Sequence, residues 1–387
     1  MANVFLMPKH VVYGENALKM SMDEIKTYGK KAMIVTDKNM VDLGYIKKLT
    51  AELDQNGIAY FLYSEINSEP VHTMVDKGVD LYKNEKCDFF IALGGGSPID
   101  AMKAIAAVTA NGGNITEYVG KALANNLPPM AAIPTTAGTG SETTRFTIIA
   151  NANTNVKMLI NNPRIIPSCA VLDPEFTLTL PAPVTAATGI DALTHALEAY
   201  TSVKANPLSD LFAVSAIKKI FENLYKAFTN GADKTSRREM LMASFEAGVS
   251  FCNSSVSIVH GMSRPIGALF HVPHGMSNAM LLEGCLNYLK SGVTDRLCEL
   301  AKAIGAYKAG MSMEEGAEAF VGATNSLIHS LKIKTPKDYG ITKEEFFKYI
   351  PKMSEDAMAS GSPLNTRRTP TKEILVELYT KLWNETC

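Results

Sequence analysis

The sequence has almost no net charge and no long apolar run, and each shortage excludes a class of partner. Its 387 residues carry 38 basic and 39 acidic side chains, a formal net charge of −1. Without an excess of positive charge, neither nucleic acid nor an anionic membrane surface is attracted to it. No run of about 18 apolar residues could span a bilayer, and the N-terminal stretch lacks the pattern of a signal peptide. We therefore expect a cytoplasmic protein that binds neither nucleic acid nor membrane.

Cysteine is sparse, and its spacing excludes two further classes. The six cysteines are scattered and form no CxxC pair, which argues against a zinc ribbon and against a disulfide framework. We expect reduced, mostly buried thiols at Cys87, Cys169, Cys252, Cys285, Cys298 and Cys387. Internal repeats and low-complexity tracts are also lacking. The 46% hydrophobic and 20% charged content is that of a globular protein, long enough for two domains.

Histidine, in contrast, is concentrated in the second half of the chain. In GIDALTHALEAY (189–200), Asp191 and His195 are four residues apart and would share one face of a helix. His260 and His274 follow in a segment punctuated by glycine and proline, which can fold back on itself. Three imidazoles and one carboxylate suit Fe²⁺ or Zn²⁺ better than Mg²⁺ or Ca²⁺. Spacing alone does not establish such a site, because an isolated i, i+4 pair is more often a helix-surface pair. The second half also contains His271 and His329.

Two strand–loop–helix patterns in the first half predict a nucleotide-binding domain. In DFFIALGGGSPIDAMKAIAAVTA (88–110), three glycines would let the backbone approach a pyrophosphate at a helix N-terminus. The loop is not G-x-G-x-x-G, and a flexible turn is the alternative. The segment MAAIPTTAGTGSETT (130–144) repeats the design with hydroxyl groups. The candidate cofactor residues of the two loops are Gly94, Gly95, Gly96, Ser97, Pro98, Thr135, Thr136, Gly138, Thr139 and Ser141.

An acidic residue follows a predicted strand near the start of the chain. The apolar stretch from Ala32 to Thr36 ends at Asp37. A carboxylate there can accept hydrogen bonds from the adenosine ribose, and its charge would repel a 2′-phosphate, which favours NAD over NADP. The equally simple alternative is that Asp37 caps the helix that follows.

The pattern changes from mixed to helical near residue 182. Amphipathic runs then follow at 184–201, 207–228, 235–252 and 277–305. Near the C-terminus, Thr342 begins a capping box and Thr369-Pro370 marks another helix start. We therefore predict an α/β nucleotide-binding domain over residues 1–182 and an all-helical, metal-binding domain over residues 183–387.

Four ordered motifs resemble one family over essentially the whole chain. GGGSPID, PTTAGTGSE, GIDALTHALEAY and HGM-x-RPIGA-x-FHVPHG resemble the iron-containing (group III) alcohol dehydrogenases, in particular their propanediol dehydrogenase and lactaldehyde reductase branch. The resemblance implies the fold shared with dehydroquinate synthase, NAD(H) as cofactor, a homodimer or higher homo-oligomer, and Fe²⁺, with Zn²⁺ possible. The implied metal ligands are Asp191, His195, His260 and His274.

The resemblance also implies roles for individual residues of the first half. It places the 135–141 loop against the nicotinamide and its ribose. Asp100, in the first turn of a predicted helix, would lie near the cofactor, and Lys157 would reach the cofactor ribose. The alternatives are an ordinary acidic residue of a helix first turn for Asp100 and a solvated surface residue for Lys157.

The sequence departs from the family pattern at two places. Many members carry a second histidine four residues after the first, whereas this position is Arg264, which cannot accept a proton at neutral pH. A proton relay would have to use another group such as His271, although packing of that ring is the simpler interpretation. Arg264 would instead bind an anionic part of the substrate, bind the cofactor phosphates or pair with a structural acid. The second departure, CNSSVSIVH (252–260), changes the expected shape of the substrate pocket.

The sequence thus predicts an NAD-dependent alcohol dehydrogenase or aldehyde reductase that acts on small primary alcohols or diols. The ion would act as a Lewis acid on the substrate oxygen while hydride passes between the carbinol carbon and the nicotinamide. The alternatives are a glycerol dehydrogenase-like or dehydroquinate synthase-like enzyme, and a cofactor-binding protein without catalysis.

Overall fold

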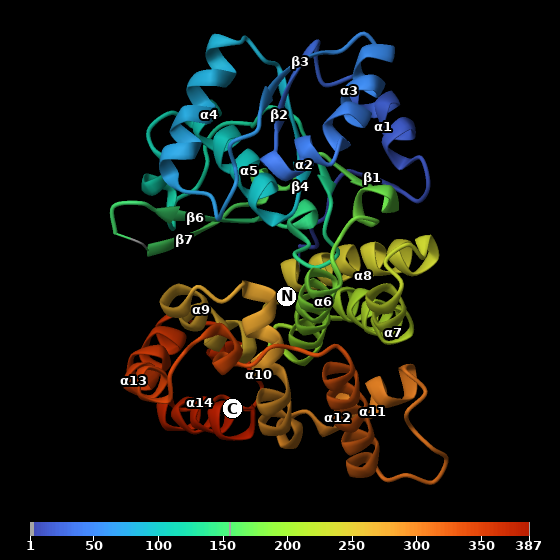
Figure 1. Cartoon of the computed structure of the whole chain (residues 1–387), viewed down its shortest axis with the longest axis vertical. Helices are drawn as coiled ribbons and strands as arrows, with labels where there is room; N and C mark the ends of the chain where they lie inside the picture. Colours follow the sequence, from blue (N-terminus) through green and yellow to red (C-terminus); the bar gives the residue numbers. More distant parts are fainter. Residues whose placement is uncertain (1–3, 155, 387) are drawn as a thin grey trace. The chain divides into compact units, whose positions relative to one another are not determined.

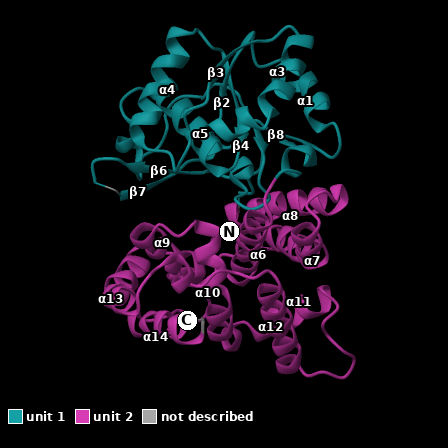
Figure 2. Cartoon of the chain, in the orientation of Figure 1, with its two compact units in different colours: residues 1–179 teal, residues 180–387 magenta. Residues whose placement is uncertain are grey.

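A computed structural model describes residues 4–154 and 156–386 of the chain (Figure 1). The chain divides into two compact units, Met1–Thr179 and Leu180–Cys387 (Figure 2). The division falls slightly before residue 182, where the sequence pattern changes. Leu180 belongs to the second unit because its carbonyl oxygen accepts a hydrogen bond of 3.0 Å from Nη2 of Arg237, within the helical unit.

The first unit is built on a parallel six-stranded sheet with the order β1-β8-β5-β4-β2-β3. Its central strand β4 is buried at every position, as expected for a sheet covered on both faces. Alternate residues of the strands pack against α4 and α5 on one face and against α1 and α3 on the other. The strands are His10–Tyr13 (β1), Lys31–Val35 (β2), Ala59–Tyr63 (β3), Phe89–Gly94 (β4), Met130–Pro134 (β5) and Cys169–Leu172 (β8). The helices are Ala17–Ile25 (α1), Lys38–Asp42 (α2), Tyr45–Gln55 (α3), His72–Asn84 (α4) and Gly96–Asn111 (α5).

The sheet brings the predicted loops to a common edge. Strands β2, β4 and β5 are adjacent and parallel, so their carboxyl ends lie side by side. Asp37 follows β2, the glycine loop follows β4 and the Thr135 loop follows β5. Ligands of open α/β sheets bind at this edge, next to a point where the strand order reverses. An antiparallel hairpin that the sequence analysis does not anticipate, Phe146–Asn151 (β6) and Val156–Asn161 (β7), follows β5.

The second unit is helical throughout its described part. Its helices are Ala182–Thr201 (α6), Pro207–Thr229 (α7), Lys234–Cys252 (α8), Ile258–Phe270 (α9), His274–Leu289 (α10), Thr294–Ala303 (α11), Met313–Ser330 (α12), Lys343–Ala359 (α13) and Lys372–Thr386 (α14). The predicted fold, an α/β domain followed by an all-α domain, is confirmed. Thr342 caps α13 by accepting from the Glu345 amide, and α14 begins two residues after the predicted Thr369-Pro370 start.

One prediction for this unit is wrong. The run 277–305 is not one helix, because a 3-10 turn at Lys290–Gly292 separates α10 from α11. The segment with His260 and His274 does fold back on itself, through two helices joined by a short turn, and α9 keeps Pro265 in its interior. A proline there removes one backbone hydrogen bond, but burial of most of the apolar residues of α9 offsets this loss. The chain turns only at His271, in the left-handed conformation with φ +55°, before Pro273 leads into α10.

Two observations complete the description of the fold. The five cysteines of the described chain are free and buried, and Cys387 lies outside the described residues. Over the same part of the chain, no helix combines the length and apolar character needed to cross a bilayer.

Candidate metal centre and cofactor loops

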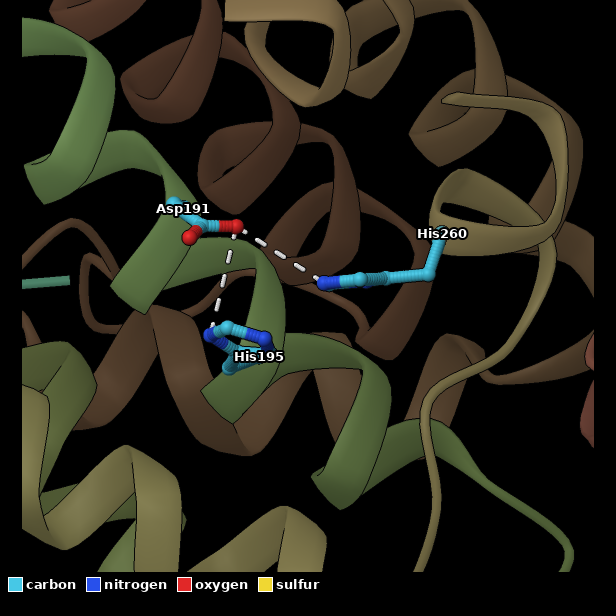
Figure 3. Close-up of side chains that lie close together, drawn as sticks. All are labelled: Asp191, His195 and His260. Carbon is cyan, nitrogen blue, oxygen red and sulfur yellow. Dashed lines mark ion pairs between the residues drawn. The ribbon is translucent and has the colours of Figure 1, made fainter. Parts of the chain in front are cut away.

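Three helices of the second unit bring the four predicted metal ligands together. Asp191 and His195 lie one turn apart on α6, His260 lies on α9, and His274 is the first residue of α10. Oδ1 of Asp191 lies 4.0 Å from Nδ1 of His195, 3.7 Å from Nε2 of His260 and 3.9 Å from Nε2 of His274. Figure 3 shows the first three of these side chains converging. They are buried, whereas 47% of the His274 side chain is exposed.

The residues present fit a divalent ion of borderline softness. Four ligand atoms held about 2.0–2.1 Å from a tetrahedral ion would lie about 3.4 Å apart, and the distances from Oδ1 of Asp191 to the three imidazole nitrogens, 3.7–4.0 Å, come near this value. Nδ2 of Asn278 lies 2.7 Å from Oδ1 of Asp191 and 3.3 Å from Nε2 of both His260 and His274. One carboxylate oxygen and two imidazole nitrogens thus surround a single amide nitrogen. A divalent cation would bind these three atoms more strongly than the amide does.

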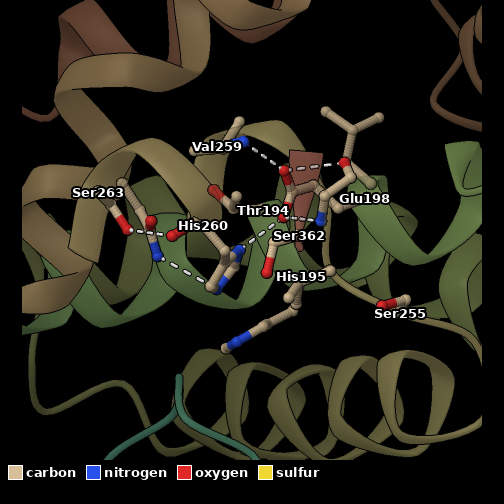
Figure 4. A network of polar contacts seen from close by, with 12 residues as sticks. Thr194, His195, Glu198, Ser255, Val259, His260, Ser263 and Ser362 are labelled. Carbon is tan, nitrogen blue, oxygen red and sulfur yellow. Dashed lines mark hydrogen bonds and ion pairs between the residues drawn. The ribbon is translucent and has the colours of Figure 1, made fainter. Parts of the chain in front are cut away.

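Glu198 fixes the orientation of His260 (Figure 4). Its Oε2 lies 2.6 Å from Nδ1 of His260, and its oxygens also accept hydrogen bonds from the Ser257 amide and hydroxyl and from the Val259 amide. Because Nδ1 is engaged, Nε2 is the nitrogen that faces Asp191. A carboxylate behind a histidine is the arrangement that orients metal-ligating imidazoles and raises their basicity.

The electrostatics of the centre keep the carboxylates ionised. Desolvation raises the pKa of Asp191, but His195, His260 and His274 outweigh it and leave this pKa below its usual range. Glu198 behaves in the same way, with His260 and two backbone amides opposing desolvation. Desolvation lowers the pKa of His260, and the two carboxylates more than reverse that shift.

The surroundings of His274 favour the neutral form of its ring. Desolvation lowers the pKa of His274, Asp191 opposes this, and the positive charges of His260, His195 and Arg264 lower the pKa further. A neutral imidazole is the form that binds a metal ion.

In the first unit, the structure brings the two predicted cofactor loops into contact. Gly96 begins α5 and Gly95 caps it, so the first amide groups of the helix follow the glycine turn. A Cβ at Gly95 would lie 3.4 Å from Thr136, and one at Gly96 would lie 3.1 Å from Thr139. A Cβ at Gly94, where φ is +157°, would lie 2.6 Å from Pro98. The lack of a side chain at Gly96 therefore helps the two loops to approach, and that at Gly94 leaves room for Pro98 within the first loop.

Asp100 and Ser141 bind each other and stabilise the contact between these loops. Oδ1 of Asp100 accepts a hydrogen bond of 2.5 Å from Oγ of Ser141, and its Oδ2 accepts one of 2.9 Å from the Ile148 amide. Nζ of the buried Lys103 donates to Ser141 at 2.9 Å and also to Thr144 and Phe146. These contacts give Asp100 and Ser141 structural partners, and their contact with the cofactor stays a prediction.

The other two predicted cofactor residues also have partners within the protein. Asp37 caps α2 by accepting a hydrogen bond of 3.3 Å from the Met40 amide, as the alternative interpretation expects. Burial raises the pKa of Asp37. Lys157 lies on β7, where its Nζ forms an ion pair of 2.9 Å with Glu69. Neither the cap formed by Asp37 nor the ion pair of Lys157 tests the role predicted for that residue in cofactor binding, so both roles stay predictions.

The two predicted catalytic residues lie at different places on α9. Arg264 is in the interior of the helix, and its Nη1 donates a hydrogen bond of 3.0 Å to Oγ of Ser362. His271 is the exposed residue at the C-terminal end of the helix. The expectation that the His271 ring is packed is therefore wrong, because the left-handed turn directs this residue to the surface.

Three further residues of these sites are not predicted from the sequence, although the spacing of Glu198 and Asn278 indicated their positions. Glu198 lies three residues after His195 and seven after Asp191, hence on the same helix face. Asn278 lies four residues after His274. Glu142, in the second predicted cofactor loop, is buried, and its carboxylate has no hydrogen-bond partner in another residue of the described chain. Nothing in its local sequence indicates this burial.

Comparison with known proteins finds similarity along both units. The family model "Iron-containing alcohol dehydrogenase" matches residues 8–174, and "Fe-containing alcohol dehydrogenase family, C-terminal" matches residues 185–383. A 1,3-propanediol dehydrogenase of Citrobacter freundii is 35% identical over 380 residues, which cover 97% of either chain. An NAD-dependent methanol dehydrogenase of Bacillus methanolicus is 35% identical over 368 residues, 94% of this chain and 96% of the relative.

Solved structures show the same likeness. A 1,3-propanediol oxidoreductase crystal structure superposes with a TM-score of 0.95 at 33% identity and covers 99% of this chain and 100% of its own. A sulfoacetaldehyde reductase from Bifidobacterium kashiwanohense, in complex with NAD⁺, gives a TM-score of 0.89 at 28% identity and covers 99% of both chains.

Proposed function

Because this chain belongs to the iron-containing alcohol dehydrogenase family, we propose that it transfers hydride between NAD(H) and small primary alcohols, diols or the corresponding aldehydes. The observation that carries the proposal is the convergence of three imidazoles on Oδ1 of Asp191, all within 4.0 Å. The propanediol and NAD-dependent methanol dehydrogenases among the relatives support the substrate class and the cofactor.

The chain's own residues prepare the reaction in three ways. Asp191, His195, His260 and His274 would hold Fe²⁺, or Zn²⁺, and Glu198 orients His260 for this purpose. The glycine turn before α5 would hold the pyrophosphate of NAD(H), with the 135–141 loop beside it. When bound, the ion supplies Lewis acidity that polarises the substrate oxygen, and the nicotinamide supplies or accepts the hydride.

Metal analysis combined with turnover tests the proposal. The protein would be purified anaerobically, and its iron and zinc content and its NADH oxidation with propanal and butanal would be measured. We expect His260→Ala to lose both metal and turnover. His329→Ala is the matched control, because His329 pairs with Glu283 at 3.1 Å at the surface. If His260→Ala keeps its metal or its activity, the ligand set is wrong.

Asp37 provides a test of cofactor choice that separates charge from structure. We propose that its carboxylate disfavours the 2′-phosphate of NADP(H). Asp37→Asn removes the charge and keeps a good helix cap, whereas Asp37→Ala removes both. We expect Asp37→Asn to raise the ratio of kcat/KM for NADPH over NADH by about tenfold, which is the effect of about 1.4 kcal/mol. An unchanged ratio would leave Asp37 only its role as the cap of α2.

We also propose that the enzyme is a cytoplasmic homo-oligomer. The free, buried thiols of the described chain support a reducing compartment. Strand β1 lies at an edge of the sheet, where one side of its backbone is unpaired and can join a second copy. Light scattering of the purified protein would give its mass in solution.

A further inference from the structure

Arg264 is a largely shielded cation with too few partners. Its guanidinium offers five N–H donors, and it makes one hydrogen bond, from Nη1 to Oγ of Ser362 at 3.0 Å. Within residues 4–154 and 156–386, no carboxylate lies within 4.0 Å of it. Arg296, in the same unit, shows the usual arrangement, because it pairs with Asp210 at 2.5 Å and donates to the Tyr200 carbonyl. An unpaired, shielded charge is costly and uncommon in proteins.

The carboxylate of Glu198, whose charge acts on Arg264, is already engaged. Glu198 raises the pKa of Arg264, while desolvation lowers it by more. Both oxygens of Glu198 are used by His260, Ser257 and Val259. An intramolecular acid therefore does not neutralise the guanidinium, and the alternative that Arg264 pairs with a structural acid is wrong.

Arg264 lies close to the candidate metal centre. It follows the ligand His260 by four residues, one turn of α9, so the two residues share a face of the helix. Its charge also lowers the pKa of His274 on α10. Because side chains one turn apart on a helix are neighbours, a small molecule bound at the metal centre could also reach the guanidinium.

We propose that Arg264 binds an anionic group at the end of the substrate away from the reacting carbon. The preferred substrate would be a short aldehyde or alcohol that carries a terminal carboxylate or sulfonate, rather than a neutral diol. The inference rests on the proposed function, because it names the substrate class of that same site. A guanidinium suits this task, since its planar fork binds an oxyanion with two parallel hydrogen bonds.

Matched pairs of aldehydes test the proposal with the metal-loaded enzyme. The quantity measured is the kcat/KM for 4-oxobutanoate divided by that for butanal, and likewise for 3-oxopropane-1-sulfonate over propanal. We expect the wild type to favour at least one anion by about tenfold or more, the effect of a charge-assisted hydrogen bond. The pair with the larger ratio distinguishes a carboxylate from a sulfonate. Because each ratio compares two substrates of one preparation, incomplete metal loading cancels.

Substitutions then assign the preference to Arg264. We expect Arg264→Gln to reduce the ratio by about tenfold or more, mainly through KM for the anionic aldehyde. Arg264→Lys keeps the charge but lacks the planar guanidinium, so it should reduce the ratio less. This variant also keeps the proposal testable if Arg264→Gln does not fold. Arg238→Gln is the control, because Arg238 is exposed and pairs with Glu239. Calorimetric titration with 4-hydroxybutanoate and with butan-1-ol gives the same comparison as binding.

The outcomes separate this inference from the proposed function. If no aldehyde oxidises NADH, the proposed function fails. If neutral aldehydes react and neither ratio favours the anion or changes in Arg264→Gln and Arg264→Lys, only the inference fails. If Arg264→Gln instead raises KM for NADH and leaves the ratios unchanged, the guanidinium serves the cofactor and the inference is overturned.

Discussion

At the scale of single residues, the metal centre depends on the side chains that stand behind its ligands. A partner on one ring nitrogen orients the imidazole so that the other nitrogen can bind a metal ion, and Glu198 provides this for His260. Glu198 has no exposed surface and accepts hydrogen bonds from four groups. It is therefore a rigid acceptor, and its loss should weaken metal binding without removing a ligand.

The change Glu198→Gln tests this role. The amide keeps the size of the side chain but carries no charge, and it cannot accept at both of its polar atoms. We expect the affinity for Zn²⁺ or Fe²⁺ to fall about 10- to 100-fold, as measured by competition with a chelator. Glu283→Gln is the matched control, since Glu283 pairs with the exposed His329 and its loss should leave the metal affinity unchanged. Equal effects of the two variants would show that Glu198 does not support the centre.

Glu142 predicts a pH dependence of stability in the first unit. Burial raises the pKa of Glu142 to about 7 from an ordinary value of 4.5, and Lys103 opposes this only in part. Between these two values the folded chain keeps a proton that the unfolded chain has lost, so this residue lowers stability as the pH rises through that window. Below pH 4.5 both states are protonated and the effect is absent.

Glu142→Gln removes this titration. The difference in stability between the variant and the wild type should grow in favour of the variant by on the order of 2 kcal/mol as the pH rises from 5 to 8. Melting temperatures of both proteins at the two pH values measure the difference. Glu377→Gln, on the exposed face of α14, should show no such change with pH. A difference of the opposite sign would mean that Glu142 is ionised in the folded state.

At the scale of elements, the centre requires α6 and α10 to approach each other closely. Gly275 follows the ligand His274, and a Cβ at this position would lie 2.6 Å from the carbonyl oxygen of Ala187 and 3.4 Å from Cβ of Asp191. Ala187 and Asp191 are one turn apart on α6. The absence of a side chain at Gly275 therefore lets α10 begin beside the ligands of α6. The backbone of α6 cannot change rotamer as a side chain can. A larger residue at position 275 would therefore push α6 and α10 apart.

Gly275→Ala should therefore separate the helices. We expect a loss of about 1–3 kcal/mol of stability together with weaker metal binding, because His274 moves away from Asp191. Gly284→Ala is a control in the same helix, where an added Cβ meets no atom within 4 Å. The free energy of unfolding of that variant should rise by up to about 1 kcal/mol, and its metal binding should be unchanged. Thermal unfolding and chelator competition measure both effects, and a metal affinity unchanged in Gly275→Ala would contradict the prediction.

At the scale of the whole molecule, the four predicted metal ligands and the predicted cofactor loops belong to different units. All four ligands lie beyond Leu180, and the loops of β4 and β5 lie before Thr179. An ion that binds only the folded protein stabilises the part that contains its ligands, by about 2.7 kcal/mol at a concentration 100 times its Kd. Metal removal should therefore affect the two units unequally.

Hydrogen exchange can detect this difference. After anaerobic chelation, we expect peptides from α6, α9 and α10 to exchange faster by up to about 100-fold. Peptides from β2, β4 and β5 should exchange as before. His260→Ala, measured with and without metal, should show no difference in either unit. Equal acceleration in both units would indicate that the chain unfolds as one cooperative body.

The sequence by itself determined the features that depend on neighbours along the chain. The buried strands, the glycine turn before α5, the Thr342 cap and the Asp191–His195 pair follow from local periodicity and backbone chemistry, which act over a few residues. The ordered motifs also indicated the family. Only the tertiary structure decided that Pro265 lies inside a helix, that Lys157 pairs with Glu69, and that Arg264 has no acidic partner among the described residues. These depend on burial and on contacts between residues far apart in the chain, and local sequence specifies neither.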